Sequence, residues 1–246
     1  MRIGSVDFSP RPWSCIATGV FLLLFARLGV WQLDRAEMKA GLLDEIQSRQ
    51  SMEEITSLEL DLDDEGLAWR RARLSGVFQA APLVLLDNRV RGGIPGYFVY
   101  SVFRATGGNN ILVNRGWVQA MPRREELPEI MTPAEPMEIH GSLKLPPRTG
   151  KLLADNTDEV LHDRFIRLQF LDLDHVNRNY DLDVVPMVLR LDEGASASFE
   201  TGWASPATGR EKHLGYAFQW FAMATALAVI FVVLNSKRTG KNDAGE

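Results

Sequence analysis

The sequence predicts a membrane protein in which two transmembrane α-helices flank a β-rich (α+β) extracytoplasmic domain, built as an antiparallel barrel or sandwich. Three observations predict this fold class. Residues 214–234 form an uncharged run of 21 residues, residues 12–31 form a second apolar run, and short strand-like segments separated by turns lie between them. As a helix, each run is long enough to cross the hydrocarbon core of a bilayer, roughly 30 Å thick.

Composition narrows the function classes. The chain has 246 residues, of which 46% are hydrophobic and 24% charged, and this excludes a disordered chain. Its formal net charge of −5 argues against a general nucleic-acid binder, which needs a basic surface. A single cysteine, Cys15, excludes an intramolecular disulfide, a Cys-pair metal site and CxxC redox chemistry.

The first apolar run is expected to be an uncleaved anchor. Arg27 lies about one turn from its end, where the side chain can reach the headgroups. No small-residue cleavage site follows the run, as it would after a signal peptide. Apolar residues recur at helical spacing in residues 31–49, so the helix is expected to continue beyond the membrane.

The middle of the chain alternates between strand and turn patterns. Residues 57–66 are acidic and are interpreted as a solvated connector, and residues 172–180 as a short helix capped by Asp172 or Asp174. Strands are expected where β-branched and aromatic residues cluster between Gly- and Pro-containing turns. These segments are residues 71–78, 83–87, 97–104, 111–119, 138–145, 165–169 and 184–192.

The charges that flank the two apolar runs predict their orientation. Two arginines precede the first run, and Lys237, Arg238 and Lys241 follow the second. Residues 32–213 contain 21 Lys and Arg against 29 Asp and Glu, a net charge of −8. Because positively charged flanks stay in the cytoplasm, both termini are expected there and the middle region outside.

The predicted organisation is a cytoplasmic N-terminus, a first span, an extracytoplasmic domain, a second span and a cytoplasmic tail. These parts are residues 1–11, 12–31, 32–213, 214–234 and 235–246. No Arg-rich, acid-poor transit peptide precedes the first run, which favours a multi-pass protein of a bacterial inner membrane with its central domain in the periplasm.

His213 stands immediately before the second apolar run, at the expected outer interface. Positions 213, 216, 217 and 220 share one face of a helix. That face carries an imidazole, two aromatic rings and one small side chain, from His213, Tyr216, Ala217 and Trp220. This set suits an axial haem ligand, with Arg27 or Arg210 meeting the propionates if the two helices pair. The alternative is an interfacial belt, because Tyr and Trp favour the headgroup region.

Two arginine motifs have a structural and a functional interpretation. They are the loop that begins at Asn88 and Arg89 and the Asn114, Arg115, Gly116, Trp117 segment. In the structural interpretation, each arginine pairs with an acidic neighbour and stacks on an aromatic ring. In the functional interpretation, it belongs to a docking surface for an anionic group, such as a propionate or a partner's carboxylate.

Sequence motifs for catalysis are missing. No HExxH, GxSxG, P-loop or helix-opening GxGxxG motif occurs, and His140, His162 and His175 form no paired metal motif. The chain is therefore not expected to be an enzyme.

Four segments resemble the Surfeit locus protein 1 family of cytochrome oxidase assembly factors. They are RLGVWQLDRAEMK, LLDNRVRGGIPGY (which includes Gly96 and Tyr97), ILVNRGWV and HLGYAFQWFAMA. The resemblance covers residues 27–234, loosely between 120 and 210. It implies a non-catalytic factor in the biogenesis of haem-copper terminal oxidases, with haem a bound through the histidine that opens the second span, here His213.

The partners that the resemblance implies are the catalytic subunit of the oxidase, haem a synthase and the lipid bilayer, with no nucleic acid. A different class of function stays open beside it. In that alternative, the chain is a membrane-tethered protein-interaction module that binds no haem.

Overall fold

The computed structural model describes residues 2–3, 6–58, 65–146, 159–161, 164–203 and 208–238. Most of the predicted acidic connector, at residues 59–64, lies outside these ranges. The chain divides into two compact units. The helical unit comprises Met1–Asp44 and Ala204–Glu246, and the barrel unit comprises Glu45–Trp203.

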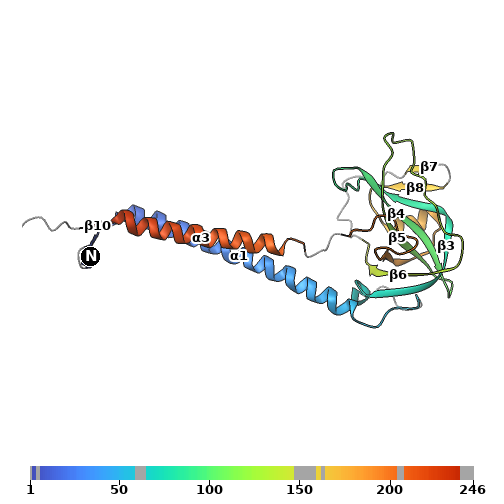
Figure 1. Cartoon of the computed structure of the whole chain (residues 1–246), viewed down its shortest axis with the longest axis horizontal. Coiled ribbons are helices and arrows are strands. Elements are labelled where there is room, and N and C mark those ends of the chain that lie inside the picture. Colours follow the sequence, from blue (N-terminus) through green and yellow to red (C-terminus); the bar gives the residue numbers. More distant parts are fainter. Residues whose placement is uncertain are drawn as a thin grey trace, which may run out of the picture. The chain divides into compact units, whose positions relative to one another are not determined.

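Two long apolar helices form most of the helical unit (Figure 1). They are α1 (Pro12–Gln50) and α3 (Arg210–Asn235), and both are long and apolar enough to cross a membrane. The expected extension of the first helix beyond the apolar run is confirmed. Helix α3 begins four residues before the predicted span, because hydropathy detects its apolar part and overlooks a first turn that carries Arg210, Glu211 and Lys212.

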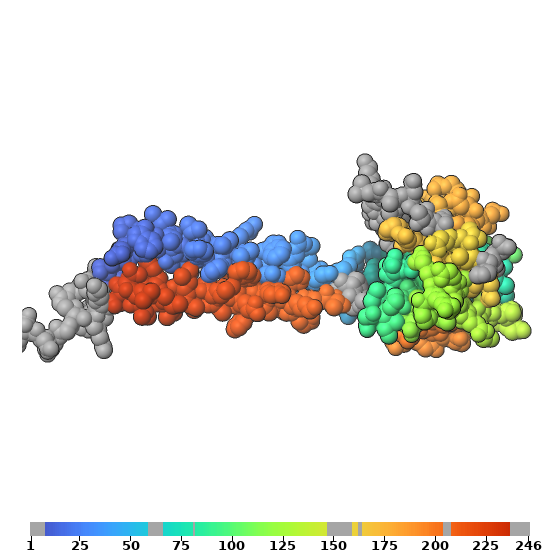
Figure 2. All heavy atoms as spheres, turned by 90° about the horizontal axis from the view of Figure 1, so that it is seen from above, coloured from blue at the N-terminus to red at the C-terminus, as the bar shows by residue number. Residues whose placement is uncertain are grey.

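The two helices pack side by side (Figure 2). The rings of Phe25 and Trp220 lie 5.7 Å apart between centroids. A Cβ atom added at Gly29 would lie 2.7 Å from the ring of Phe221, so this glycine allows the close approach. The helices run antiparallel, since contacts that move forward along α3 move backward along α1.

Three short strands of the helical unit form a small sheet that the sequence patterns did not predict. Strands β1 (Arg2–Ile3), β2 (Val6–Phe8) and β10 (Ser236–Arg238) pair antiparallel in the order β1-β2-β10. The N–H of Ser9 donates to the carbonyl of Asn235 at 3.1 Å. The segments before α1 and after α3 therefore lie together at one end of the helix pair.

Five strands of the barrel unit close into a barrel (Figure 1). They follow the order β4-β5-β9-β6-β3, and β3 pairs again with β4. Their bounds are β3 (Arg71–Leu86), β4 (Gly96–Ala105), β5 (Asn110–Gln119), β6 (Met137–Lys144) and β9 (Val184–Leu191). Two further strands, β8 (Phe165–Leu168) and β7 (Glu159–Leu161), extend the sheet from β3.

The sequence predicts an antiparallel barrel or sandwich, but two of the strand pairs in the structure are parallel. The pairs β5–β9 and β3–β8 are parallel. Parallel pairing needs a long connection instead of a hairpin, and both pairs join segments far apart in the chain. Strand β3 also differs from the expectation of two strands at residues 71–78 and 83–87. It runs through a register shift between Phe78 and Leu83 that accommodates Pro82, which has no N–H to donate.

Short helical elements complete the barrel unit. They are η1 (Glu65–Leu67) and α2 (Leu173–Tyr180). The predicted short helix is confirmed, and its N-cap is Asp172, whose carboxylate accepts a hydrogen bond from the N–H of His175 at 3.1 Å.

The strands bury both of their faces. One face of all five barrel strands builds a core with Phe103, Leu143 and Leu189. The other face carries a second core, in which Leu112 and Val188 pack with residues of α2 such as Val176. Since side chains alternate along a strand, neighbouring residues of β4, β5, β6 and β9 point into different environments.

Candidate functional site

His213 lies in the first turn of α3, where its ring meets α1. Its Nδ1 atom is 2.7 Å from the Oε1 atom of Gln32 on α1. An amide oxygen only accepts hydrogen bonds, so an N–H at Nδ1 is the donor in this contact. In the neutral imidazole, this arrangement leaves the Nε2 atom with an unshared electron pair.

The face expected around His213 is divided between the helix interface and the outside. Ala217 is 2% exposed, so the space beside this small residue is taken by helix packing. Trp220 packs on Phe25 of α1. Tyr216 is 51% exposed and lies away from the interface. The structure thus brings His213 and Trp220 together along the interface and leaves Tyr216 outside it.

The two arginines expected near this site are both exposed. Arg27 lies on α1, and Arg210 is the first residue of α3, one turn before His213. Among the described residues, no group of three or more His, Cys, Asp or Glu side chains could hold a metal ion. His140 lies 3.0 Å from Glu138 on β6, and His162 is outside the described residues.

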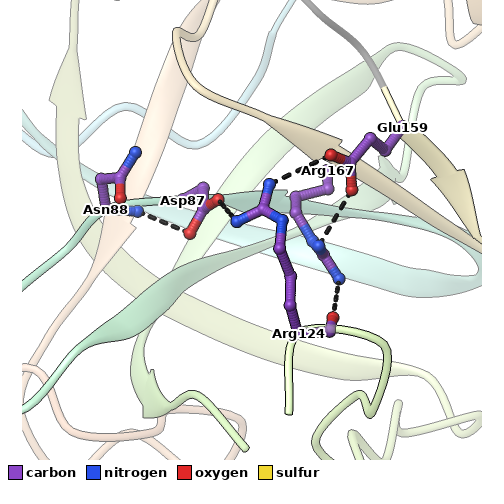
Figure 3. A network of polar contacts seen from close by, with 5 residues as sticks. All are labelled: Asp87, Asn88, Arg124, Glu159 and Arg167. Carbon is purple, nitrogen blue, oxygen red and sulfur yellow. Dashed lines mark hydrogen bonds and ion pairs between the residues drawn. The ribbon is translucent and has the colours of Figure 1, made fainter.

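The loop that begins at Asn88 is anchored by charges at the end of β3 (Figure 3). The carboxylate of Asp87 accepts hydrogen bonds from the N–H of Asn88 at 2.7 Å and from Arg124 at 2.8 Å. Arg124 also binds Glu159 at 3.0 Å, and Glu159 accepts from Arg167 at 2.9 Å. Two arginines face two carboxylates, so this network is balanced in charge and serves the fold.

Arg115 is buried in the barrel unit without a carboxylate. It donates to the carbonyls of Ala197 at 2.8 Å and Met131 at 2.9 Å, and its Cζ atom lies 4.6 Å from the ring centroid of Phe199. The expectation of an acidic partner is therefore wrong for this residue, and the aromatic ring on which it stacks belongs to Phe199 instead of the neighbouring Trp117. Carbonyl oxygens supply the partial negative charge instead, and burial lowers the pKa of Arg115 to about 10.

The other residues of the two motifs fix the backbone. Gly116 has φ of +121° at a bulge of β5, close to the backbone of Glu200. Trp117 donates from Nε1 to the carbonyl of Arg89 at 2.6 Å, and Gly96 leaves room for its ring. Tyr97 is buried, with the guanidinium of Arg167 at 5.7 Å from its ring centroid. These contacts tie the start of β4, the loop after β3 and the end of β5 together.

Three side chains that the sequence patterns did not single out contact one another, and one of them, Arg190, is opposite Asn114 in the sheet. Lys144, Arg190 and Trp69 lie in or beside strands whose patterns predicted nothing more than structure. The available signal was the strand periodicity, which places Lys144 and Arg190 on the same face as each other once the register between β6 and β9 is known.

Comparisons with known proteins identify the same family that the sequence motifs resemble. The model of the SURF1 family matches residues 19–225. A SURF1-like protein of Rickettsia bellii is 24% identical over 227 residues, which cover 86% of each chain. Surfeit locus protein 1 of Homo sapiens is 23% identical over 223 residues, which cover 83% of this chain and 71% of the human one. A SURF1-like protein of Rickettsia conorii is 26% identical, with 84% of each chain covered.

Proposed function

The chain belongs to the SURF1 family, whose model matches residues 19–225, and from this premise we propose that it is a membrane-anchored, non-catalytic assembly factor for haem-copper terminal oxidases. In this proposal it binds haem a and aids its insertion into the catalytic subunit of the oxidase. Haem a synthase is the proposed source of the haem.

The exposed apolar surface of the helices supports anchoring in a bilayer. Only 6% of the most apolar window of α1 and of α3 is buried within the protein. Large apolar side chains such as Leu23 and Phe218 are about three-quarters exposed, at 73% and 75%. Apolar surface on this scale is unfavourable in water and favourable among lipid chains.

The hydrogen bond between His213 and Gln32 is the observation that carries the haem proposal. Histidines that bind metals usually donate their second ring N–H to a carbonyl or carboxylate, which fixes the tautomer and orients the ring. Gln32 supplies that carbonyl, so Nε2 of His213 is prepared to ligate iron. When bound, haem a would supply a redox-active iron whose axial position accepts a neutral imidazole.

The surroundings of His213 fit a porphyrin in part. The exposed ring of Tyr216 offers an apolar face next to the histidine. Arg27 and Arg210 offer guanidinium groups for the propionates, because both side chains are exposed. Trp220 supports the site indirectly, since its ring stacks on Phe25 and holds the two helices together.

The test is an optical titration of detergent-solubilised full-length protein with haem a. We expect His213→Ala to abolish the Soret shift that reports ligation. Gln32→Leu should weaken haem affinity 10- to 100-fold, as the loss of an orienting partner usually does. Gln219→Leu removes the same polar group from an exposed position of α3 and should bind haem like the wild type.

A wild-type affinity in His213→Ala would remove His213 as the ligand. The alternative to haem binding is a membrane-tethered protein-interaction module without haem. The specific observation behind that alternative is that helix packing already buries Ala217, the small residue beside His213. A wild-type protein that shows no Soret shift at all, while still restoring oxidase assembly in cells, would establish it.

A further inference from the structure

Three basic side chains gather on the face of the barrel wall that also carries the second core. Tyr100 on β4 is directly opposite Asn114 on β5, Asn114 is opposite Arg190 on β9, and Arg190 is opposite Ser142 on β6. Directly paired residues point to the same side of a sheet. Lys144, two residues after Ser142, continues this row, and we call Arg89, Lys144 and Arg190 the cationic cluster.

Aromatic rings enclose two members of the cationic cluster. The Nζ atom of Lys144 lies 2.8 Å from the ring centroid of Trp69. The guanidinium carbon of Arg190 lies 4.9 Å from the ring centroid of Trp203 and 5.7 Å from that of Trp69. Cations stacked on indole faces keep their N–H groups free at the edges, where an anion can accept hydrogen bonds from them.

The third member, Arg89, approaches from the loop after β3. Its charge and that of Arg190 both act on the hydroxyl of Tyr100, which also has a hydrogen bond with Asn114. Burial raises the pKa of Tyr100 to about 12, so its hydroxyl stays protonated and can donate. Tyr100 thus links Arg89 to the row of residues that holds Lys144 and Arg190.

Among the residues that the structure describes, no carboxylate forms an ion pair with a member of the cationic cluster, although the charge of Asp192 acts on Arg190. The Nζ atom of Lys144 and the Nε atom of Arg89 are buried without a hydrogen-bond partner. The nearby carboxylate of Asp192 is already bound by both terminal nitrogens of Arg71, each at 2.6 Å. Burying unpaired cations is costly, in contrast to the balanced network of Asp87, Arg124, Glu159 and Arg167.

The backbone of Trp69 is strained where its ring covers Lys144. Trp69 has φ of +72°, a left-handed conformation that bulky residues rarely adopt. Its N–H donates to the carbonyl of Leu143 at 2.8 Å, so pairing with the end of β6 keeps it in place. Strain of this kind persists where the surrounding structure requires one side-chain position.

We propose that the cationic cluster is a binding site for an oxyanion, the carboxylate or phosphate group of a small ligand. The stacked guanidinium of Arg190 and the ammonium of Lys144 would donate to its oxygens, and Arg89 and the Tyr100 hydroxyl would complete the charge and the hydrogen bonds. The site belongs to the barrel unit, so the proposal does not depend on haem binding by the helical unit.

The test measures the thermal unfolding midpoint of the full-length protein in detergent, followed by tryptophan fluorescence. Sodium phosphate and sodium acetate are added in separate series, with sodium chloride matching the ionic strength. At about ten times its dissociation constant, the favoured anion should raise the midpoint by about 4 °C. A larger response to phosphate assigns the ligand to phosphate esters, and a larger response to acetate assigns it to carboxylic acids.

Lys144→Met and Arg89→Met should both lose this response. Without the anion, Lys144→Met should unfold at a higher temperature than the wild type, because it removes a buried amine that has no hydrogen-bond partner. Arg104→Met, which removes an exposed cation from β4, is the matched control and should respond like the wild type. The proposal is overturned if the wild type responds no more to phosphate or acetate than to chloride, or if both cluster variants keep the response.

Discussion

Charge balance distinguishes the basic side chains that hold the barrel unit together from those that are available for a ligand. Arg71 binds Asp192 through two hydrogen bonds of 2.6 Å, and Arg167 binds Glu159. Arg115 has only carbonyl and hydroxyl acceptors, but they satisfy three of its nitrogens. Lys144 has neither kind of partner in the described part of the chain, although burial and the charge of Arg190 act on it. The stability of the fold alone does not explain a buried basic side chain that has no hydrogen-bond acceptor.

The protonation of Lys144 should make stability depend on pH. Burial, and then the charge of Arg190, lower its pKa to about 6 in the folded protein, against 10.5 for the free side chain. Between these values the unfolded chain binds a proton that the folded chain does not, so stability rises with pH. In anion-free buffer, the wild type should therefore gain stability relative to Lys144→Met as pH increases from 6 towards 10.

Chemical denaturation of both proteins at several pH values measures this difference. Both proteins contain the neighbouring charged groups, which are Arg89, Arg190 and Asp192. The contributions of these groups cancel when the unfolding free energy of one protein is subtracted from that of the other. The unfolding free energy of Arg104→Met should depend on pH in the same way as that of the wild type, because Arg104 is exposed and solvent screens its charge. Parallel curves for the wild type and Lys144→Met would show that the amine stays protonated when the protein folds.

Sequence patterns identify some of these residues and not others for a physical reason. Arg89 and Arg115 attract attention because they lie among glycines and a tryptophan in short, distinctive motifs. Lys144 and Arg190 lie in ordinary strand patterns, and their importance depends on the register of β6 and β9. A register between distant strands is set by tertiary packing, which local periodicity does not encode. His213 is recognisable from the sequence, but its partner Gln32 requires the pairing of α1 with α3.

Sequence patterns also predict some elements of secondary structure and not others. Strands β4, β5, β6, β8 and β9 are confirmed to within about two residues, because each carries a run of buried apolar or aromatic side chains. Strand β7 and the terminal strands have three residues or fewer, too short for a period to be recognised. The closure of the barrel through β3 and β4 depends on a strand that continues past Pro82, where the local pattern predicts a break.

The pairing of α1 with α3 should depend on the absence of a side chain at Gly29. A larger residue there would overlap the ring of Phe221 and separate the helices locally. We expect cysteines introduced at positions 25 and 220, whose native rings pack against each other across the interface, to be joined by a short bifunctional thiol cross-linker in a Cys15→Ser background. Adding Gly29→Ile should reduce the yield of this cross-link several-fold.

A matched control adds Gly19→Ile instead, because a Cβ at Gly19 meets no atom within 4 Å. That variant should form the cross-link as readily as the background. Combining Gly29→Ile with Phe221→Ala should restore the yield by removing the ring that is displaced. Equal yields for Gly29→Ile and Gly19→Ile would contradict the observed helix interface.

At the scale of the whole molecule, the terminal sheet restricts how the chain can cross a membrane. Strand β2 precedes α1 and strand β10 follows α3, and the two strands pair with each other. Segments joined by backbone hydrogen bonds lie on the same side of any bilayer that both helices cross. The terminal sheet therefore predicts two crossings, with the barrel unit on the side of the membrane opposite to the termini.

The positive charges near both termini predict which side is cytoplasmic, and this prediction can be tested in intact cells. Cysteines at positions 106 and 237, introduced singly into the Cys15→Ser background, are labelled with a membrane-impermeant maleimide. Thr106 is exposed in the turn between β4 and β5, so its cysteine should be labelled in intact cells once the outer membrane is permeable. The cysteine at Lys237 should be labelled only after the inner membrane is opened, because Lys237, Arg238 and Lys241 retain their end of the chain in the cytoplasm. Labelling of position 237 in intact cells, with position 106 protected, would reverse the orientation and place the cationic cluster and the proposed haem ligand on the cytoplasmic face.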